Sequence, residues 1–203
     1  MNIKKIDSPI KYTKKQKRMI NKLKPWNGSY WSTNSEVIDE LKKHILHYLK
    51  NNQGNRCAYC GNIFDITSAA EIEHIAAKGG MKREIYPEFT FTPLNLVLAC
   101  HLCNSPRKKG QIKVIDNLDQ NYKACTFKII HPYFDNPEDH LEERLSRDRK
   151  ALIFIQKSLK GKNTIQMFGL NKEAQIKART DTVIIENLPD DYREKILEAS
   201  LIK

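Results

Sequence analysis

The sequence lacks any long apolar segment. No run of apolar residues approaches the roughly 18–20 needed to span a bilayer, and the mean hydropathy of −0.61 describes a strongly polar chain. The first five residues, Met1 to Lys5, have no apolar stretch behind them, so we expect no secretory signal. Internal repeats and low-complexity tracts are absent as well. We therefore expect a cytoplasmic protein without a membrane segment.

Acidic residues are also in short supply. The chain has 24 Asp and Glu against 35 Lys and Arg, which gives a formal net charge of +11. The basic residues gather at 4–24, at 107–113 and in the last third of the chain. Nucleic acid is the simplest polyanionic partner for such a surface, and we predict DNA. A generally basic, solvated surface is the alternative.

The length and hydrophobic content allow one compact domain or a small core with extensions. The chain has 203 residues, 40 % of them hydrophobic, which is enough for a buried core. We expect a basic arm and an N-terminal helix over 1–50, a central core over 51–125 and a C-terminal extension over 126–203 that packs on the core.

Apolar periodicity and turn residues predict the main elements. Longer helices are expected at 14–23, 36–50 and 171–185. Further helices are expected to start at Pro137 and after Pro189, and a short one within 103–110. Strands are expected at 71–75, 93–100, 126–134 and 152–156, with a turn over 160–163. The pattern predicts a mixed α+β fold.

The chain has few cysteines, but most of them recur at a regular spacing. Four of the five cysteines form two CxxC pairs, Cys57 with Cys60 and Cys100 with Cys103. Two such pairs can hold one zinc ion in a closed tetrahedron of thiolates, which leaves no open position and so predicts a structural site. A redox pair or an iron–sulfur cluster is the alternative. Cys125 is expected to be a small buried side chain.

The segment between the cysteine pairs contains Glu71, Glu73 and His74. The alternation of polar and apolar residues is typical of a half-buried strand. Glu71 and Glu73 then share one face, and His74 lies on the other unless the strand bends or ends there. Alone, His74 reads more readily as a packed core histidine than as a catalytic residue.

The whole arrangement resembles the HNH endonuclease family. CxxC, an acid followed by His-Ile, an Asn-Leu, and a CxxC followed by Asn and lysines fall in that order within about residues 55–110. The resemblance implies a ββα-metal core with a structural four-cysteine zinc, flanked by mostly helical N-terminal and C-terminal extensions. It also implies metal-dependent hydrolysis of phosphodiester bonds in DNA.

The resemblance also implies roles for individual residues. His74 matches the general base, and Asn95 matches the asparagine that holds this histidine. Glu73 and Asn104 match the ligands of one catalytic divalent ion, for which oxygen donors favour Mg²⁺ or Mn²⁺. The family more often has Asp before the histidine, so Glu71 is an alternative to Glu73 as the metal ligand.

Basic residues follow the last ligand directly. Arg107, Lys108 and Lys109 are candidates for contacts with nucleic-acid phosphates, with a solvated helix face as the alternative. His44 and His47, three residues apart on the predicted helix, have no third ligand nearby. We expect them to be surface or packing histidines.

The C-terminal third carries a second resemblance. The run from His131 to Leu141, with Gly169-Leu170-Asn171 and Arg179 further on, resembles a bacterial HNH subfamily. That subfamily includes the PtuB-like nuclease subunit of Septu and retron antiphage systems, whose partner is an ATPase. The resemblance implies an antiviral defence effector with an ATPase regulatory subunit. We expect His131 and His140 to be structural and to pack the extension on the nuclease core, with metal ligation as the alternative. The alternatives are a non-catalytic zinc-knuckle module that binds nucleic acid, and a ribonuclease.

Overall fold

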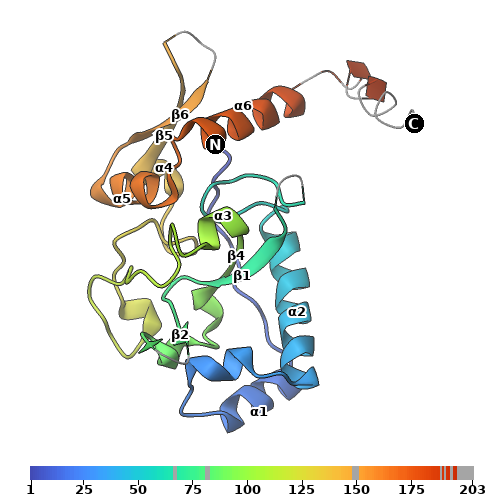
Figure 1. The fold of residues 1–203 in the computed structure, drawn as a ribbon, viewed down its shortest axis with the longest axis vertical. Helices are drawn as coiled ribbons and strands as arrows, with labels where there is room; N and C mark the ends of the chain where they lie inside the picture. Colours follow the sequence, from blue (N-terminus) through green and yellow to red (C-terminus); the bar gives the residue numbers. More distant parts are fainter. Residues whose placement is uncertain are drawn as a thin grey trace.

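The structure is a computed structural model of the full chain (Figure 1). It describes residues 1–65, 68–80, 83–147, 151–187, 189, 191–192 and 194–195. The fold is mixed α+β, with two-stranded antiparallel sheets and a buried cluster of four cysteines. The predicted fold class is therefore confirmed. Within the described ranges, no helix is both long and apolar enough to cross a membrane.

Two helices open the chain. The first, α1 (Lys14–Lys22), begins with a capping box in which the side chains of Thr13 and Gln16 each bind the other's backbone N–H. The second, α2 (Glu36–Asn52), buries the apolar stripe Ile38, Leu41, Ile45 and Leu49. A short 3-10 helix, η1 (Gly28–Ser32), lies between them. Both α-helices were predicted.

The first twelve residues are an ordered segment rather than a free arm. Ile3, Ile6 and Ile10 are buried in the core, and the Ile6 N–H donates to the Pro132 carbonyl at 2.8 Å. The segment begins beside the C-terminal part and runs past the central strands and α2 to α1 (Figure 1). The composition suggested a basic arm because lysines outnumber isoleucines over residues 1–24 as a whole.

The central hairpin is a two-stranded antiparallel sheet. Strand β1 (Ala70–His74) pairs antiparallel with β4 (Leu96–Cys100), with Glu73 opposite Val97 and His74 opposite Leu96. Every residue of β4 is buried, which explains its unbroken apolar sequence. The short helix α3 (His101–Asn104) follows directly. It starts two residues before the predicted segment and ends at Asn104.

Short elements connect the two central strands. Strands β2 (Gly79–Gly80) and β3 (Arg83–Glu84) pair with each other, followed by 3-10 helices η2 (Pro87–Phe89) and η3 (Pro93–Asn95). After α3 the chain is irregular up to η4 (Tyr122–Ala124). The strand predicted over 126–134 is wrong, because this run forms only an isolated bridge between Ile115 and Phe127. Its apolar side chains fill the core instead of extending a sheet.

The C-terminal part contains its own hairpin. The helical turn α4 (Pro137–His140) leads into β5 (Leu141–Leu145), which pairs antiparallel with β6 (Leu152–Gln156). Helices α5 (Leu159–Phe168) and α6 (Glu173–Glu186) follow. The turn predicted over 160–163 is wrong because Ser158 caps α5 through the Gly161 N–H. The predicted helix after Pro189 lies largely outside the described residues.

One hydrophobic cluster joins all three segments. It contains side chains from the N-terminal segment, the central hairpin and the C-terminal part, for example Ile6, Leu98 and Phe168. Tyr59 stacks on Phe168 with ring centroids 4.2 Å apart, which attaches α5 to the first cysteine pair. Side chains of the C-terminal part and of the central hairpin thus share one hydrophobic cluster.

Candidate functional site

The four cysteines of the two CxxC pairs meet in one buried cluster. Cys57 and Cys60 lie in a tight turn after α2, whereas Cys100 ends β4 and Cys103 lies in α3. All four Sγ atoms lie within 4.8 Å of one another. The Gly61 N–H donates to the Cys57 carbonyl at 3.0 Å and closes the first turn, and Gly61 has a φ of +72° there. Glycine adopts this conformation without strain.

The cluster has the size of a tetrahedral zinc site. Zn–S bonds of about 2.3 Å place tetrahedral sulfurs about 3.8 Å apart, and the Cys60 and Cys100 Sγ atoms are 3.8 Å apart. Hydrogen bonding by Cys103 and the other two thiols lowers the pKa of Cys100, in keeping with a thiolate ligand. Among the described residues, no other group of three or more His, Cys, Asp or Glu side chains is close enough to hold an ion.

A second feature is a pocket of about 240 Å³ at the end of β1. Glu73, His74 and Asn104 all line it, although Asn104 is 30 residues further along the chain. The strand ends at His74, so that residue is released from strict alternation and shares the pocket with Glu73. Asn104 lies next to Cys103, so the cysteine cluster holds it there.

His74 is a buried, neutral histidine. Its Nε2 lies 3.0 Å from the Thr90 carbonyl oxygen, and its ring meets Trp31 edge-on at 4.6 Å between centroids. A carbonyl only accepts, so Nε2 carries the ring proton and Nδ1 holds the lone pair. Burial, reinforced by the positive charge of Lys78, lowers the pKa of His74 to about 3. The ring is therefore neutral at pH 7, with the lone pair of Nδ1 free.

Glu73 is paired with a buried lysine. The Nζ of Lys109 forms an ion pair with Glu73 Oε1 and donates to the carbonyl oxygen of His74 at 2.6 Å. Lys109 is fully buried. Burial raises the pKa of Glu73 from its ordinary value of 4.5, although the ammonium of Lys109 acts in the opposite direction. Lys109 is thus an internal counterion and not a residue of the outer surface.

Glu71 contacts the residues that directly follow the two cysteines of the second pair, His101 after Cys100 and Asn104 after Cys103. Its carboxylate accepts from Asn104 Nδ2 and lies near His101 Nδ1, both at 2.8 Å. The side chain of Glu71 is 37 % exposed and does not line the pocket. Glu73 is therefore the better placed of the two acids, and Glu71 orients the Asn104 amide.

Asn95 holds the backbone just beyond His74. Its Oδ1 accepts from the Ala76 N–H at 2.6 Å, and its Nδ2 donates to the carbonyls of Ala76 and Phe89, both at 3.0 Å. Its own carbonyl accepts from the Ile75 N–H at 2.9 Å. Asn95 is fully buried and contacts the chain after the histidine rather than the imidazole ring.

A buried relay supports Asn95 from the C-terminal segment. The Tyr122 hydroxyl donates to Asn95 Oδ1 at 2.9 Å and lies 3.1 Å from His131 Nε2. The Tyr133 N–H donates to His131 Nδ1 at 3.2 Å. His131 therefore carries its proton on Nε2 and donates to Tyr122. Burial lowers the pKa of His131 to about 3, so the ring stays neutral.

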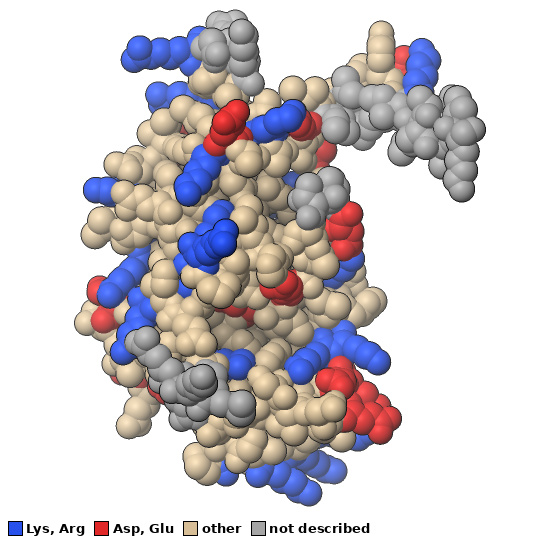
Figure 2. Space-filling model, in the orientation of Figure 1, with Lys and Arg blue, Asp and Glu red and all other residues tan. Residues whose placement is uncertain are grey.

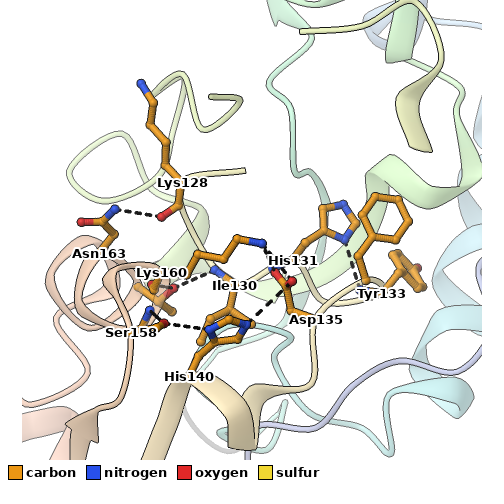
Figure 3. A network of polar contacts seen from close by, with 12 residues as sticks. Lys128, Ile130, His131, Tyr133, Asp135, His140, Ser158, Lys160 and Asn163 are labelled. Carbon is orange, nitrogen blue, oxygen red and sulfur yellow. Dashed lines mark hydrogen bonds and ion pairs between the residues drawn. The ribbon is translucent and has the colours of Figure 1, made fainter. Parts of the chain in front are cut away.

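The other C-terminal histidine belongs to a neighbouring network, shown in Figure 3. His140 Nδ1 lies 2.7 Å from Ser158 Oγ, and its Nε2 lies 3.8 Å from Asp135. Lys160 reaches both oxygens of Asp135 at 2.8 Å. These contacts join the segment after His131 to the start of α5, which supports a structural reading of both histidines.

The predicted phosphate-binding residues have three different environments. Arg107 is exposed, and Lys108 donates to the Phe168 carbonyl at the end of α5. Lys109 is the buried partner of Glu73.

On α2, His44 Nδ1 lies 2.9 Å from Gln16 of α1, and His47 is exposed. These two histidines therefore occupy packing and surface positions.

Basic side chains outnumber acidic ones on the face shown in Figure 2. Several of them gather at the end of the molecule that carries α1 (Figures 1 and 2). The sequence indicated this charge. It carried no signal for the pairing of Lys109 with Glu73, for the Tyr122 contact to Asn95, or for the approach of Trp31 to His74.

Comparison with known proteins finds distant relatives. The chain is 29 % identical over 148 residues to Septu protein PtuB of Bacillus mycoides (strain KBAB4), which covers 66 % of this chain and 48 % of PtuB. It is 35 % identical over 82 residues to Protein ea31 of Escherichia phage lambda, which covers 40 % of this chain and 22 % of ea31. The chain thus spans about half the length of PtuB and less of ea31. No family model matches it.

Proposed function

We propose that this chain is a metal-dependent endonuclease of the HNH type that hydrolyses phosphodiester bonds in DNA. The observation that carries the proposal is the pocket lined by Glu73, His74 and Asn104, at the end of a hairpin joined by the four-cysteine cluster. A structural zinc in that cluster would keep Asn104 beside the end of β1. The distant similarity to PtuB supports the same reading.

In this proposal His74 activates the attacking water. Nδ1, the nitrogen without a proton, accepts a proton from water, while the bond from Nε2 to the Thr90 carbonyl keeps the ring in that tautomer. Asn95 fixes the backbone at Ala76 and so limits the movement of the histidine. The T-shaped contact with Trp31 limits rotation of the ring.

Glu73 and the amide oxygen of Asn104 would hold the catalytic divalent ion. Carboxylate and amide oxygens suit Mg²⁺ or Mn²⁺, whereas the four thiolates suit zinc, so the two sites do not compete for one metal. When bound, the ion supplies positive charge for the scissile phosphate and for the leaving 3′ oxygen. Glu71 holds the Asn104 Nδ2, which leaves the amide oxygen as the group available to a ligand.

The test is cleavage by the His74→Ala variant. Parent, His74→Ala and the matched control His47→Ala, an exposed histidine on α2, are incubated with duplex DNA, single-stranded DNA and structured RNA plus Mg²⁺. We expect the parent and His47→Ala to cut DNA, and His74→Ala to lose at least about a hundredfold in rate while keeping its zinc content and circular dichroism spectrum.

Each other outcome has a clear meaning. Equal cutting by His74→Ala and the parent would show that the mechanism is wrong. DNA binding without cutting by the parent would identify a non-catalytic zinc module, and cutting of RNA alone would identify a ribonuclease of the same fold.

We further propose that the chain acts in bacterial antiphage defence with an ATPase regulatory subunit. The support is the resemblance of the sequence from His131 to Leu141 to the PtuB-like subfamily and the similarity to a Septu protein. Co-purification of an ATPase with the chain from its native source is the expected result. Full nuclease activity and toxicity of the isolated chain would count against a regulating partner.

A further inference from the structure

One basic residue in the pocket has no role in the nuclease proposal so far. Lys78, four residues after His74, lines the pocket together with Glu73, His74 and Asn104. It is half-buried, and its Nζ donates to the Gly79 carbonyl at 3.0 Å. Among the described residues, no carboxylate lies within ion-pair distance of that ammonium group. Lys109, by contrast, already has a carboxylate partner in Glu73.

A second cation lies on the same side of the site. Lys42 of α2 places its Nζ 5.8 Å from the centre of the Trp31 ring, and Trp31 also lines the pocket. Its carboxylate partner, Asp39, is one helical turn away at 3.7 Å, and the Lys42 side chain is only 30 % exposed. The Asp39 side chain is 52 % exposed, and an ion pair with so exposed a partner stabilises little. Lys42 therefore remains available to an anion.

The two lysines act on each other. Burial, and next the charge of Lys42, lower the pKa of Lys78, and Glu73 opposes this only in part. Because Glu73 offsets the repulsion between these two half-buried cations only in part, an excess of positive charge remains at the pocket wall. A bound phosphate would remove that repulsion and form charge-assisted hydrogen bonds.

The backbone at Lys78 is held in place by close packing against η1. A Cβ atom added to Gly28 would lie 2.5 Å from the Lys78 carbonyl oxygen, so η1 packs directly against this backbone. Trp31 of η1 lines the pocket, and Lys42 of α2 lies beside the Trp31 ring. The packing of η1 against Lys78 also fixes where Lys78 stands. This wall comes from a part of the chain outside residues 55–110.

We propose that Lys78, assisted by Lys42, holds a backbone phosphate of the nucleic acid beside His74. The inference rests on the proposed nuclease function and assigns the phosphate contact of the site to Lys78 in place of Lys109. It also makes α2, through Lys42, part of substrate binding. A phosphate held there would lie next to the general base, as positioning of the scissile bond requires.

The experiment measures binding and cleavage at several salt concentrations. Affinity is followed by fluorescence anisotropy with a short labelled DNA duplex and a labelled RNA hairpin, in the His74→Ala background so that nothing is cut. Lys78→Gln is expected to weaken binding and to reduce the slope of log affinity against log salt by about one. Lys42→Gln should act in the same direction, and Lys43→Gln, an exposed lysine on α2, should leave the slope unchanged.

Two further variants keep charge and position separate. Lys78→Arg retains the charge and should keep most of the affinity. Gly28→Ala retains every charge but displaces the Lys78 backbone, and should weaken binding as Lys78→Gln does. In the active protein, Lys78→Gln should raise KM for the substrate that the parent cuts.

The outcomes distinguish the two proposals. If Lys78→Gln matches Lys43→Gln in salt slope and in KM while the parent cuts, the assignment of Lys78 is wrong and the nuclease function stands. If the parent neither binds nor cuts either nucleic acid, the proposed function itself fails, and the inference fails with it.

Discussion

Lys109→Met is expected to destabilise the protein strongly, because it removes the counterion of a buried carboxylate. Lys109 is fully buried, and the Glu73 side chain is only 8 % exposed. Methionine has nearly the same length as lysine, so the change creates little empty space. What remains is a carboxylate without its ammonium partner and a His74 carbonyl without its donor.

The magnitude follows from the burial of both partners. Removing one partner of a buried ion pair costs about 3–5 kcal/mol, which is a large part of the roughly 5–15 kcal/mol that stabilises a folded domain. Glu73→Gln, which leaves Lys109 with carbonyl acceptors, should cost less, about 2–3 kcal/mol. The double variant should cost clearly less than the sum, since it leaves no buried charge unpaired. We expect a coupling energy of at least about 2 kcal/mol.

The assay is urea denaturation followed by circular dichroism for the four proteins of the cycle. Arg107→Met is the matched control, because Arg107 is exposed and should lie within about 0.5 kcal/mol of the parent. A loss below about 1 kcal/mol for Lys109→Met, or additive losses in the double variant, would refute the ion-pair interpretation.

The pH dependence gives an independent check with a definite sign. Burial raises the pKa of Glu73 above 4.5, and loss of Lys109 must raise it further. A raised carboxyl pKa means that the folded state holds the proton at a pH where the unfolded state has released it. Stability is therefore lost as the pH rises from about 4.5 through the pKa of the folded state. The penalty of Lys109→Met should be smaller at pH 4.5 than at pH 8.

Three further predictions concern the zinc site and the relay behind Asn95. Cys103→Ser should lose bound zinc by elemental analysis and unfold at lower urea, whereas Cys125→Ser, a change outside the cluster, should keep one zinc per chain; equal zinc in both would contradict the site. Tyr122→Phe removes the hydroxyl between Asn95 and His131, and should cost about 1–2 kcal/mol and lower the cleavage rate without raising KM; an unchanged rate would separate the relay from function. The lowered pKa of His131, about 3, means that the unfolded state binds a proton first on acidification. Stability should therefore fall as the pH drops from about 6.5 toward 3. His131→Gln should flatten this slope, and an identical slope would show that His131 is not the group responsible.

The local patterns predicted the central part of the fold well. The spacing of Ile38, Leu41, Ile45 and Leu49 indicated α2, because a helix that packs on a core repeats its apolar residues every three or four positions. The alternation around Glu73 and the apolar run before Cys100 indicated β1 and β4, which pair as a hairpin. These elements are encoded by neighbours in the sequence.

The errors occurred where tertiary contacts override local signals. Residues 160–163 read as a turn because of Gly161, yet Gly161 lies in α5 and a Cβ there would be 2.0 Å from the His140 carbonyl oxygen. The glycine permits close packing of the helix and does not end it. The run 126–134 was predicted to be a strand because it is rich in apolar and aromatic residues. These side chains instead fill the core around Tyr122, where the His131 ring also packs.

The candidate site shows the same division. CxxC spacing alone implies two thiolates on one side of a turn, and the order of the motifs was enough to nominate Glu73, His74, Asn95 and Asn104. Spacing along the chain contains no information on which distant groups approach these residues, since burial and pairing arise only when separate segments pack. Folding therefore placed Lys109 against Glu73, Trp31 against His74, and Lys78 at the pocket wall.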